Sequence, residues 1–258
     1  MTAQERAQGG PGPGTAVGVI PARFAASRFP GKPLTRIAGL PMLQRVVEGA
    51  REAKRLRAVI VATDDARIVE ACARFGAEAV LTSPDHPTGT DRIAEVAAGL
   101  ADGIVVNVQG DEPLIEGFVI DAAVDALRSD PEAPMATVVH AADPGADADP
   151  NRVKAVLDVR GRALWFSRSA LPHRRDPSAV VTTWQHVGLY AFRREFLLRF
   201  VALSRTPAER AESLEQLRVL EHGHPIRAAV VEGWRSLPVD VPGDVAAVEA
   251  RLLERGRC

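Results

Sequence analysis

The segment Val17-Gly-Val-Ile20 is a short apolar run that leads directly into Pro21-Ala-Arg23, and a helical pattern follows over residues 42–56. Further apolar runs alternate with helical patterns as far as residue 139. The predicted strands cover 58–62, 79–81, 104–108 and 135–139, and the predicted helices cover 66–75, 91–100 and 117–128. Strands that alternate with helices favour an α/β fold, with a mostly parallel or mixed central sheet covered by helices on both faces.

The second half of the chain has a different character. An acidic, proline-rich loop covers 141–151. Strand-like segments are expected at 153–158, 163–167, 187–192 and 226–231, with helices at 209–222 and 243–255. These patterns predict one α/β domain over 15–258, with an inserted lobe at about 140–186 that carries dimer contacts. Residues 1–14, which end in GGPGPG, are expected to be a disordered leader.

The overall composition excludes several classes of protein. The 258 residues carry a formal net charge of −1, with 25% charged residues, so no global basic field is present to hold nucleic acid. No apolar stretch reaches the ~20 residues of a membrane helix, and no signal peptide is recognisable, which indicates a cytoplasmic location. Two cysteines are too few for a disulfide framework or a structural zinc site. Cys72 is expected to be buried in a helix, and Cys258 is the last residue.

Three cations follow the first predicted strand within a short distance. Arg23, Arg28 and Lys32 would lie near the carboxyl edge of the sheet, where open parallel sheets bind ligands. Arginine offers bidentate contacts to phosphate and lysine a point charge, so this loop suits a polyphosphate. It is not a Walker A loop, because Ala26 stands at the first glycine position and Pro33 replaces the serine or threonine. A solvated basic loop is the alternative interpretation.

Carboxylates follow two other apolar segments. Asp111 comes just after the strand at 104–108, in Gln109-Gly-Asp-Glu-Pro113, and Asp240 lies in a turn before the last helix. Magnesium takes one or two carboxylates together with phosphates and water, so Asp111 is a plausible ligand and Asp240 a possible second one. An ordinary loop acid is an equally good interpretation of Asp111. For Asp240, the pattern by itself favours a turn acid at a helix start.

Other polar segments are less specific. In the loop at 81–92, Thr90 or Asp91 can cap the following helix, and backbone amides near Gly89 could recognise a base edge. His186 and Tyr190 are four residues apart on a predicted strand and therefore share a face. Residues of these types are more often part of a core or its rim. The run 212–218 would usually be an exposed helix face.

Taken together, seven segments resemble one family, the CMP-KDO synthetases (3-deoxy-manno-octulosonate cytidylyltransferases). The segments are IPAR-x-x-x-SR-x-PGKPL, HPTGTDR, VNVQGDEP, FSRS-x-LP, H-x-G-x-YAFR, ESLEQLRVLE and VD-x-P-x-D, in the family's order. The resemblance covers about residues 17–255. The first segment is shared with other cytidylyltransferases, including CMP-sialate synthetases, whereas the QGDEP, H-x-G-x-Y and LEQLR group is more specific.

The resemblance implies a nucleotide-diphosphosugar transferase type of fold, a homodimer, and a magnesium-dependent transfer of CMP from CTP to an acidic 3-deoxy sugar such as KDO, as in lipopolysaccharide biosynthesis. Arg23, Lys32, Asp111 and Asp240 would be catalytic, the two aspartates as Mg²⁺ ligands. The implied nucleotide contacts are Arg23, Ser27, Arg28, Lys32, Thr88, Gly89, Thr90, Arg92 and Gln109. The implied sugar contacts are Gln109, Arg168, His186, Tyr190, Glu215 and Gln216.

Some positions depart from the family pattern. His173 stands where a tryptophan is expected, Gln185 stands where a basic residue is common, and the loop at 141–151 matches no motif. These differences lie on the expected sugar side and leave the exact sugar open. The alternatives are a CMP-sialate-type synthetase, another nucleotidyltransferase, or a non-catalytic nucleotide-binding protein. The presence of both Asp111 and Asp240 argues against the last of these.

Overall fold

The computed structural model describes residues 12–25, 29–143, 145–173, 175–176 and 178–254. The chain divides into two compact units: unit 1 contains residues up to Asp121 together with those from Ser236 onward, and unit 2 contains Ala122–Arg235. The division falls within helix α4 (Gly117–Ser129). The lobe predicted at 140–186 belongs to unit 2.

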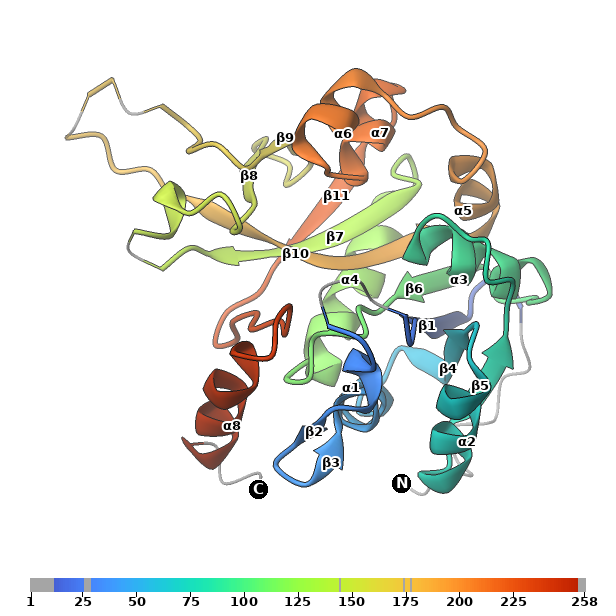
Figure 1. Cartoon of the computed structure of the whole chain (residues 1–258). Coiled ribbons are helices and arrows are strands. Elements are labelled where there is room, and N and C mark those ends of the chain that lie inside the picture. Colours follow the sequence, from blue (N-terminus) through green and yellow to red (C-terminus); the bar gives the residue numbers. More distant parts are fainter. Residues whose placement is uncertain (1–11, 26–28, 144, 174, 177, 255–258) are drawn as a thin grey trace. The chain divides into compact units, whose positions relative to one another are not determined.

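Unit 1 is built on four parallel strands in the order β6-β1-β4-β5 (Figure 1). They are β1 (Ala16–Ala22), β4 (Leu56–Thr63), β5 (Glu78–Leu81) and β6 (Ile104–Asn107). The register pairs Val19 with Ile60 on one side and with Asn107 on the other. All of β6 and nearly all of β1 are buried, because parallel strands with both faces covered carry continuous apolar runs. This confirms the predicted α/β class.

Helices pack against these strands as the apolar periodicity predicts. They are α1 (Met42–Arg51), α2 (Ala66–Arg74) and α3 (Gly89–Ala98), and α2 and α3 lie alongside β5 and β1 (Figure 1). The helix predicted at 42–56 ends at Arg51, since residues 52–55 form a turn into β4. Cys72 is fully buried in α2, as predicted, and burial raises the pKa of its thiol to about 11.

The C-terminal segment of unit 1 ends in α8 (Asp244–Glu254). Its apolar side chains join those of the first part of the chain in one buried cluster: Ile37, Met42, Leu114, Val239, Val248 and Leu252. Short elements that the periodicity did not reveal lie nearby: the 3₁₀ turn η2 (Lys32–Leu34) and the hairpin strands β2 (Arg36–Ile37) and β3 (Leu40–Pro41).

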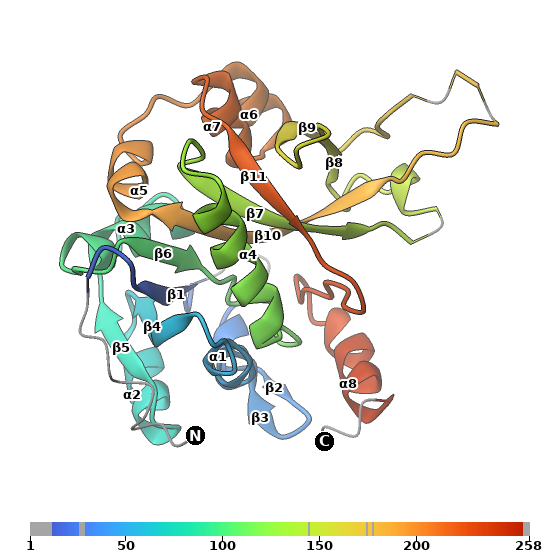
Figure 2. The same cartoon turned by 180° about the vertical axis from the view of Figure 1, so that it is seen from behind.

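Unit 2 contains a mixed sheet in which β7 lies between β11 and β10 (Figure 2). β7 is parallel to β11 and antiparallel to β10, and β8 and β9 continue the antiparallel part. The bounds are β7 (Met135–Ala141), β8 (Lys154–Leu157), β9 (Ala163–Ser167), β10 (Trp184–Arg193) and β11 (Ile226–Val230). The loop predicted at 141–151 includes a 3₁₀ turn, η3 (Ala146–Ala148).

The single helix predicted at 209–222 is wrong, because the segment forms two short helices. α6 (Pro207–Glu212) ends at Ser213, whose φ of 52° is left-handed, and α7 (Gln216–Glu221) follows. An additional helix, α5 (Arg194–Phe200), precedes them. Among the described residues, every helix is too short or too polar to cross a membrane.

Candidate functional site

One cavity of unit 1 collects residues from three of the sequence segments singled out above. Its volume is about 450 Å³, and it lies where β1 and β6 end at the same edge of the parallel sheet. The predicted site residues among those that line it are Arg23, Lys32, Thr88, Gly89, Gln109 and Asp111. Ligand sites of α/β sheets are expected at this edge, so the cavity is the candidate nucleotide site.

Backbone geometry brings the three segments close together. Gly31 has a φ of 72°, a left-handed conformation that glycine adopts without strain, and it precedes Lys32 in η2. At Gly110 a Cβ atom would lie 2.8 Å from the carbonyl oxygen of Pro21, so a larger residue would push β1 and the loop after β6 apart. Gly110 therefore permits the close approach that places Asp111 beside the exit of β1.

The acidic side of the cavity carries a short ion pair. The Nζ atom of Lys32 lies 2.9 Å from Oδ2 of Asp111 and 3.7 Å from Oδ1 of Asp240. The three side chains are partly exposed, at 15% for Lys32, 30% for Asp111 and 49% for Asp240. Two carboxylates that are distant in the sequence thus face one cation.

The loop that carries Asp240 is held by backbone contacts on both sides. The amide of Val239 donates to the carbonyl of Asp111 at 2.9 Å, and the amides of Asp240 and Val241 donate to Oδ2 of Asp244 at 2.7 and 2.9 Å. Asp244 thereby begins α8 and closes the turn. Asp240 thus lies next to the turn that leads into the last helix, as the pattern predicts, and Asp244 is the first residue of that helix.

Glu112 follows Asp111 directly and is buried, with 6% of its surface exposed. Its carboxylate accepts hydrogen bonds from the hydroxyl of Ser236 and, at 3.3 Å, from the amide of Leu237. Burial raises the pKa of Glu112 to about 8, because the charged carboxylate loses its water, and the nearby carboxylates of Asp111 and Asp240 raise the pKa further. No pattern in the sequence predicts a role for this residue, although its place between Asp111 and Pro113 identifies it as a second acid of the same loop.

Two of the cavity's residues contact the loop before α3. Arg23 donates through Nη2 to the carbonyl of His86 and, at 3.4 Å, to that of Thr88. Thr88, not Thr90 or Asp91, is the N-cap of α3, since its hydroxyl accepts from the amide of Asp91 while the Asp91 side chain accepts from the amide of Thr88. The helix N-terminus consequently faces the cavity with Gly89 in its first turn.

Thr90 and Arg92 are placed differently from the other predicted nucleotide contacts. Arg92 is fully buried, and its guanidinium bonds to Asp64 at 2.8 Å and to the Thr82 hydroxyl at 2.5 Å. Thr90 is 4% exposed and accepts from Asn107, whose amide oxygen in turn accepts from Gln109 at 3.3 Å. Neither residue lines the cavity, and Thr90 is connected to the lining residue Gln109 through Asn107. Ser27 and Arg28 lie outside the described residues.

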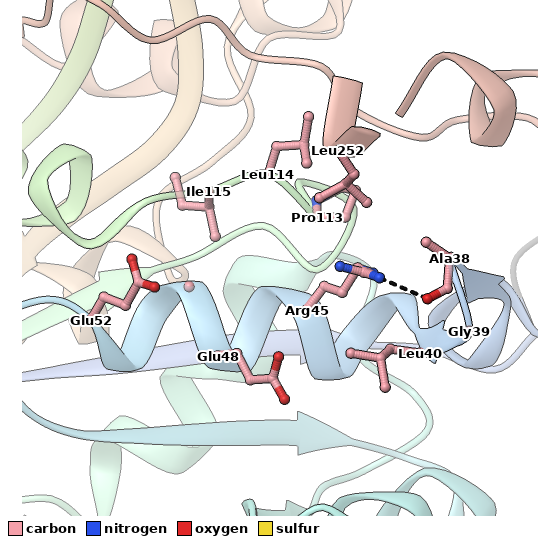
Figure 3. Close-up of a pocket in the computed structure, with 11 residues that line it drawn as sticks. Ala38, Gly39, Leu40, Arg45, Glu48, Glu52, Pro113, Leu114, Ile115 and Leu252 are labelled. Carbon is pink, nitrogen blue, oxygen red and sulfur yellow. Dashed lines mark hydrogen bonds between the residues drawn. The ribbon is translucent and has the colours of Figure 1, made fainter. Parts of the chain in front are cut away.

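A larger cavity of about 690 Å³ lies elsewhere in unit 1 (Figure 3). It is lined by the outer side of α1, the turn between β2 and β3, residues 113–115 and Leu252. Arg45 closes one end by donating to the carbonyls of Ile37 and Ala38. Its described lining contains none of the residues predicted to bind nucleotide, sugar or metal, so chemistry rather than size decides which cavity is the candidate site.

Unit 2 holds all of the residues predicted to contact the sugar except Gln109, which lies in unit 1, and three of those in unit 2 form a contiguous group. The hydroxyl of Tyr190 donates to Oε1 of Gln216 at 3.1 Å, and the rings of His186 and Tyr190 lie 5.5 Å apart on one face of β10, as predicted. The Nε2 atom of Gln216 is buried and has no hydrogen-bond partner among the described residues. Glu215, the N-cap residue of α7, precedes Gln216 and helps to raise the pKa of Tyr190, whose main cause is burial.

His186 is held as a neutral ring. It is 8% exposed, packs edge-on against Phe166 at 4.9 Å, and its Nε2 lies 3.0 Å from the hydroxyl of Thr137. Burial lowers its pKa to about 3, since an imidazolium in this environment would lose its water. The ring therefore acts as a hydrogen-bonding and packing group rather than as a cation.

Arg168 lies just past the end of β9 and contacts both the end of α6 and the loop before β8. Its Nε donates to the carbonyl of Glu212 at 2.7 Å, its Nη1 donates to the carbonyl of Pro150 at 3.1 Å, and its amide donates to the Glu212 carboxylate at 2.8 Å. A buried lysine, Lys154, donates to the carbonyls of Arg168 and Asp149. No role was predicted for Lys154, although a lysine within a predicted apolar strand indicates a charged group that must find polar partners in the interior.

Comparisons with known proteins agree with this arrangement. A family model described as Cytidylyltransferase matches residues 17–226. The 3-deoxy-manno-octulosonate cytidylyltransferase of Syntrophotalea carbinolica is 51% identical over 244 residues, covering 91% of this chain and 97% of its own. That of Myxococcus xanthus is 51% identical over 241 residues, covering 93% and 97%.

Solved structures give the same relationship. The structure of a CMP:2-keto-3-deoxy-manno-octonic acid synthetase complexed with CTP superposes with a TM-score of 0.89 at 41% identity, covering 93% of this chain and 99% of that one. A Leptospira borgpetersenii cytidylyltransferase, 17% identical with a TM-score of 0.63, shares the fold and covers 93% and 87% of the two chains. The chain belongs to the cytidylyltransferase family, and within it to the 3-deoxy-manno-octulosonate cytidylyltransferases.

Proposed function

We propose that this enzyme transfers CMP from CTP to the anomeric hydroxyl of a 3-deoxy sugar acid, KDO or a close relative, and releases pyrophosphate. It is a nucleotidyltransferase by family. The observation that supports this reaction is the 450 Å³ cavity, because two cations, the Asp111 carboxylate and polar groups from three distant segments meet in its lining at one sheet edge. Its relatives carry the name of this activity, and one related synthetase has been solved with CTP.

The nucleotide side of the reaction needs cations for the phosphates and polar groups for the base. Arg23 and Lys32 supply the positive charge, and Ser27 and Arg28 belong to the same proposed phosphate-binding loop. Thr88, Gly89 and Gln109 supply polar groups on another part of the lining. A helix N-terminus that opens into the cavity adds donors suited to an anion or a base edge.

The residues present fit a magnesium ion. Asp111 and Asp240 both approach the Lys32 ammonium, so two carboxylates can face one cation. Magnesium prefers one or two carboxylates completed by phosphates and water, which matches this donor set. When bound, the ion would polarise the phosphate under attack and offset the charge of the leaving pyrophosphate. Asp111 and Asp240 are therefore its proposed ligands.

The reaction itself is a displacement at phosphorus. A bond forms between the anomeric oxygen and the α-phosphorus, the bond from that phosphorus to the bridging oxygen breaks, and the hydroxyl proton is released to water. Arg23 and Lys32 stabilise the phosphates that leave, while the cavity fixes the line of attack. No protein nucleophile is required, and catalysis rests on positioning and electrostatics.

The sugar side is assigned to unit 2. Tyr190, Gln216 and the neutral His186 present a hydroxyl, an amide and an aromatic edge, which suit the hydroxyl groups of a sugar. The buried amide nitrogen of Gln216, which has no partner within the part of the chain that the structure describes, is a donor that a sugar oxygen would satisfy. Arg168 is the proposed partner of the sugar carboxylate, with Glu215 as a further contact in unit 2, whereas Gln109, the remaining predicted sugar contact, belongs to unit 1. A cytoplasmic homodimer remains part of this proposal.

Pyrophosphate release is the direct test of the function. The enzyme is incubated with CTP and Mg²⁺, and with KDO, N-acetylneuraminate or no sugar in parallel. Release that depends on KDO is the expected result. Release that depends on N-acetylneuraminate alone would transfer the assignment to a CMP-sialate synthetase, and the absence of release with either sugar acid would reject the proposal.

A further inference from the structure

We infer that Glu112 is the positioning residue that aligns the two proposed metal ligands, Asp111 and Asp240, with each other. The inference rests on the proposed metal-dependent function. Glu112 does not line the described part of the nucleotide cavity, and its carboxylate points to the chain segment that precedes Asp240. Asp111 and Glu112 are therefore neighbours with different partners: one faces the cavity, and the other holds the segment that delivers the second ligand.

The contact joins parts of the chain that are far apart in sequence. Glu112 and Ser236 are separated by 124 positions, and the Ser236 hydroxyl and the Leu237 amide both donate to the Glu112 carboxylate. Two residues further on, the amide of Val239 donates to the carbonyl of Asp111 at 2.9 Å. The backbone that leads to Asp240 is consequently attached twice to the loop that carries Asp111.

The segment from Ser236 to Asp244 has other contacts, but these do not hold its start, which is the part that Glu112 contacts. Val239 is fully buried in the apolar cluster of unit 1, and Asp244 holds the amides of Asp240 and Val241. The burial of Val239 anchors the middle of the segment in the core, and the hydrogen bonds to Asp244 hold the turn after Asp240. The two hydrogen bonds to Glu112 hold the start of the segment, at Ser236 and Leu237. They thereby limit the distance between the Asp240 and Asp111 carboxylates.

The burial of Glu112 supports a role beyond general packing. A carboxyl group that is 6% exposed, with no ion pair among the described residues, is costly to keep in the interior. An apolar side chain of similar size would fill the same volume, but it could not direct the backbone of the opposite segment. When a residue that orients a metal ligand is replaced, the affinity for the metal typically falls about 10–100-fold.

Metal affinity, rather than turnover, is the decisive measurement. Mn²⁺ is used as the probe for the Mg²⁺ site, in the presence of CTP and without sugar acid, and free Mn²⁺ is followed by electron paramagnetic resonance. Glu112→Leu keeps the volume and removes both acceptors, and we expect it to raise the Kd for Mn²⁺ about tenfold. Glu112→Gln keeps one acceptor oxygen, and its Kd should stay within about threefold of wild type because part of the contact survives.

Two further variants separate positioning from stability. Ser236→Ala removes one donor from the same contact and should raise the Kd about threefold, and the double variant with Glu112→Leu should bind no more weakly than Glu112→Leu alone. Glu249→Ala is the matched control, because Glu249 also attaches the C-terminal segment, through the Ala38 amide at 2.7 Å, but on α8. It should lower the melting temperature and leave the Kd within about twofold of wild type.

An unchanged Kd in Glu112→Leu, or in Ser236→Ala should the leucine variant fail to fold, would overturn the inference. An equal rise of the Kd in Glu249→Ala would also overturn it, since any loosened segment would then have the same effect. Pyrophosphate release by the wild-type enzyme is measured on the same preparation. Its absence would count against the proposed function, whereas normal release together with unchanged Mn²⁺ binding in the variants would reject only the role of Glu112.

Discussion

The ammonium of Lys32 lies 2.9 Å from Oδ2 of Asp111, and this ion pair closes the acidic side of the nucleotide cavity. The same nitrogen lies 3.7 Å from Asp240. A lysine between two carboxylates neutralises part of their mutual repulsion, so the pair can be held in place before a metal ion arrives. Substitution of Lys32 and substitution of the carboxylates should therefore affect metal binding differently.

Asp111→Ala is expected to abolish turnover and to preserve the fold. Asp111 is partly exposed at a strand end, so its removal creates no core cavity. Loss of a metal anchor removes about 4 kcal/mol of transition-state stabilisation, which corresponds to roughly a thousandfold in rate. Pyrophosphate release at saturating Mg²⁺ and a melting curve give the two readouts. The exposed Asp85→Ala is the control, and near-wild-type turnover in Asp111→Ala would refute the metal role.

Lys32→Met should separate metal binding from nucleotide binding. Without CTP, the ammonium competes with a metal ion for the two carboxylates, so its removal should tighten Mn²⁺ binding about fivefold, the equivalent of ~1 kcal/mol for a partly exposed pair. With CTP, the same variant lacks a phosphate-binding cation, and its KM for CTP should rise. Titration of Mn²⁺ without nucleotide and steady-state kinetics test both parts. Weaker Mn²⁺ binding in the variant would show that Lys32 does not compete for the site.

Nucleotide choice should follow the size of the cavity and its polar groups. CTP is expected to be used far better than ATP or GTP, and UTP should be the nearest competitor because it differs mainly at one exocyclic group. Where a site is built to hydrogen-bond a group, its absence costs more than about a hundredfold in kcat/KM. Measurement of kcat/KM for the four nucleotides with KDO held saturating decides this. Equal efficiency with ATP and CTP would exclude the assignment.

Arg168→Lys tests the proposed contact between Arg168 and the carboxylate of the sugar acid. A guanidinium makes two parallel bonds to a carboxylate, so lysine should raise the KM for the sugar acid about tenfold to a hundredfold, with little change in the KM for CTP. The contacts of Arg168 with Glu212 and Pro150 define the rival interpretation, in which Arg168 only holds the end of α6 and the loop before β8 in place. In that case thermal stability would fall and both substrates would suffer alike. An unchanged KM for the sugar would defeat the prediction.

The pH dependence of stability should include a contribution from His186. Its pKa is about 3 in the folded protein, below its ordinary value near 6.5, so the unfolded chain binds a proton more readily. The folded state therefore loses stability as the pH falls below about 6.5, by about 2 kcal/mol at pH 5. Melting temperatures of the wild type and His186→Gln between pH 7 and pH 5 test this. The variant should lose less, and parallel curves would contradict the buried, neutral histidine.

The order of strands and helices in unit 1 could be predicted from the sequence, because apolar periodicity reports which faces are covered. The placement of Arg23 and Asp111 could be predicted too, since both follow strands that are parallel and therefore end at one edge. The break at Ser213 escaped prediction because a left-handed serine leaves the apolar spacing of the helices around it intact. Arg92 resembles a ligand-binding residue in its motif, yet its burial beside Asp64 depends on packing that no motif encodes.

Asp240 shows most clearly what the amino-acid sequence determines and what only the tertiary structure decides. From the sequence it is an acid in a turn before a helix, and local chemistry predicts no more than that. Its approach to Lys32 arises because Val239 and Leu252 enter the same apolar cluster as Met42, and because Glu112 holds Ser236. Preferences for turns and helices depend on neighbouring residues, so they can be predicted along the sequence. A site built from distant segments forms only when the apolar residues of those segments are buried in the same core.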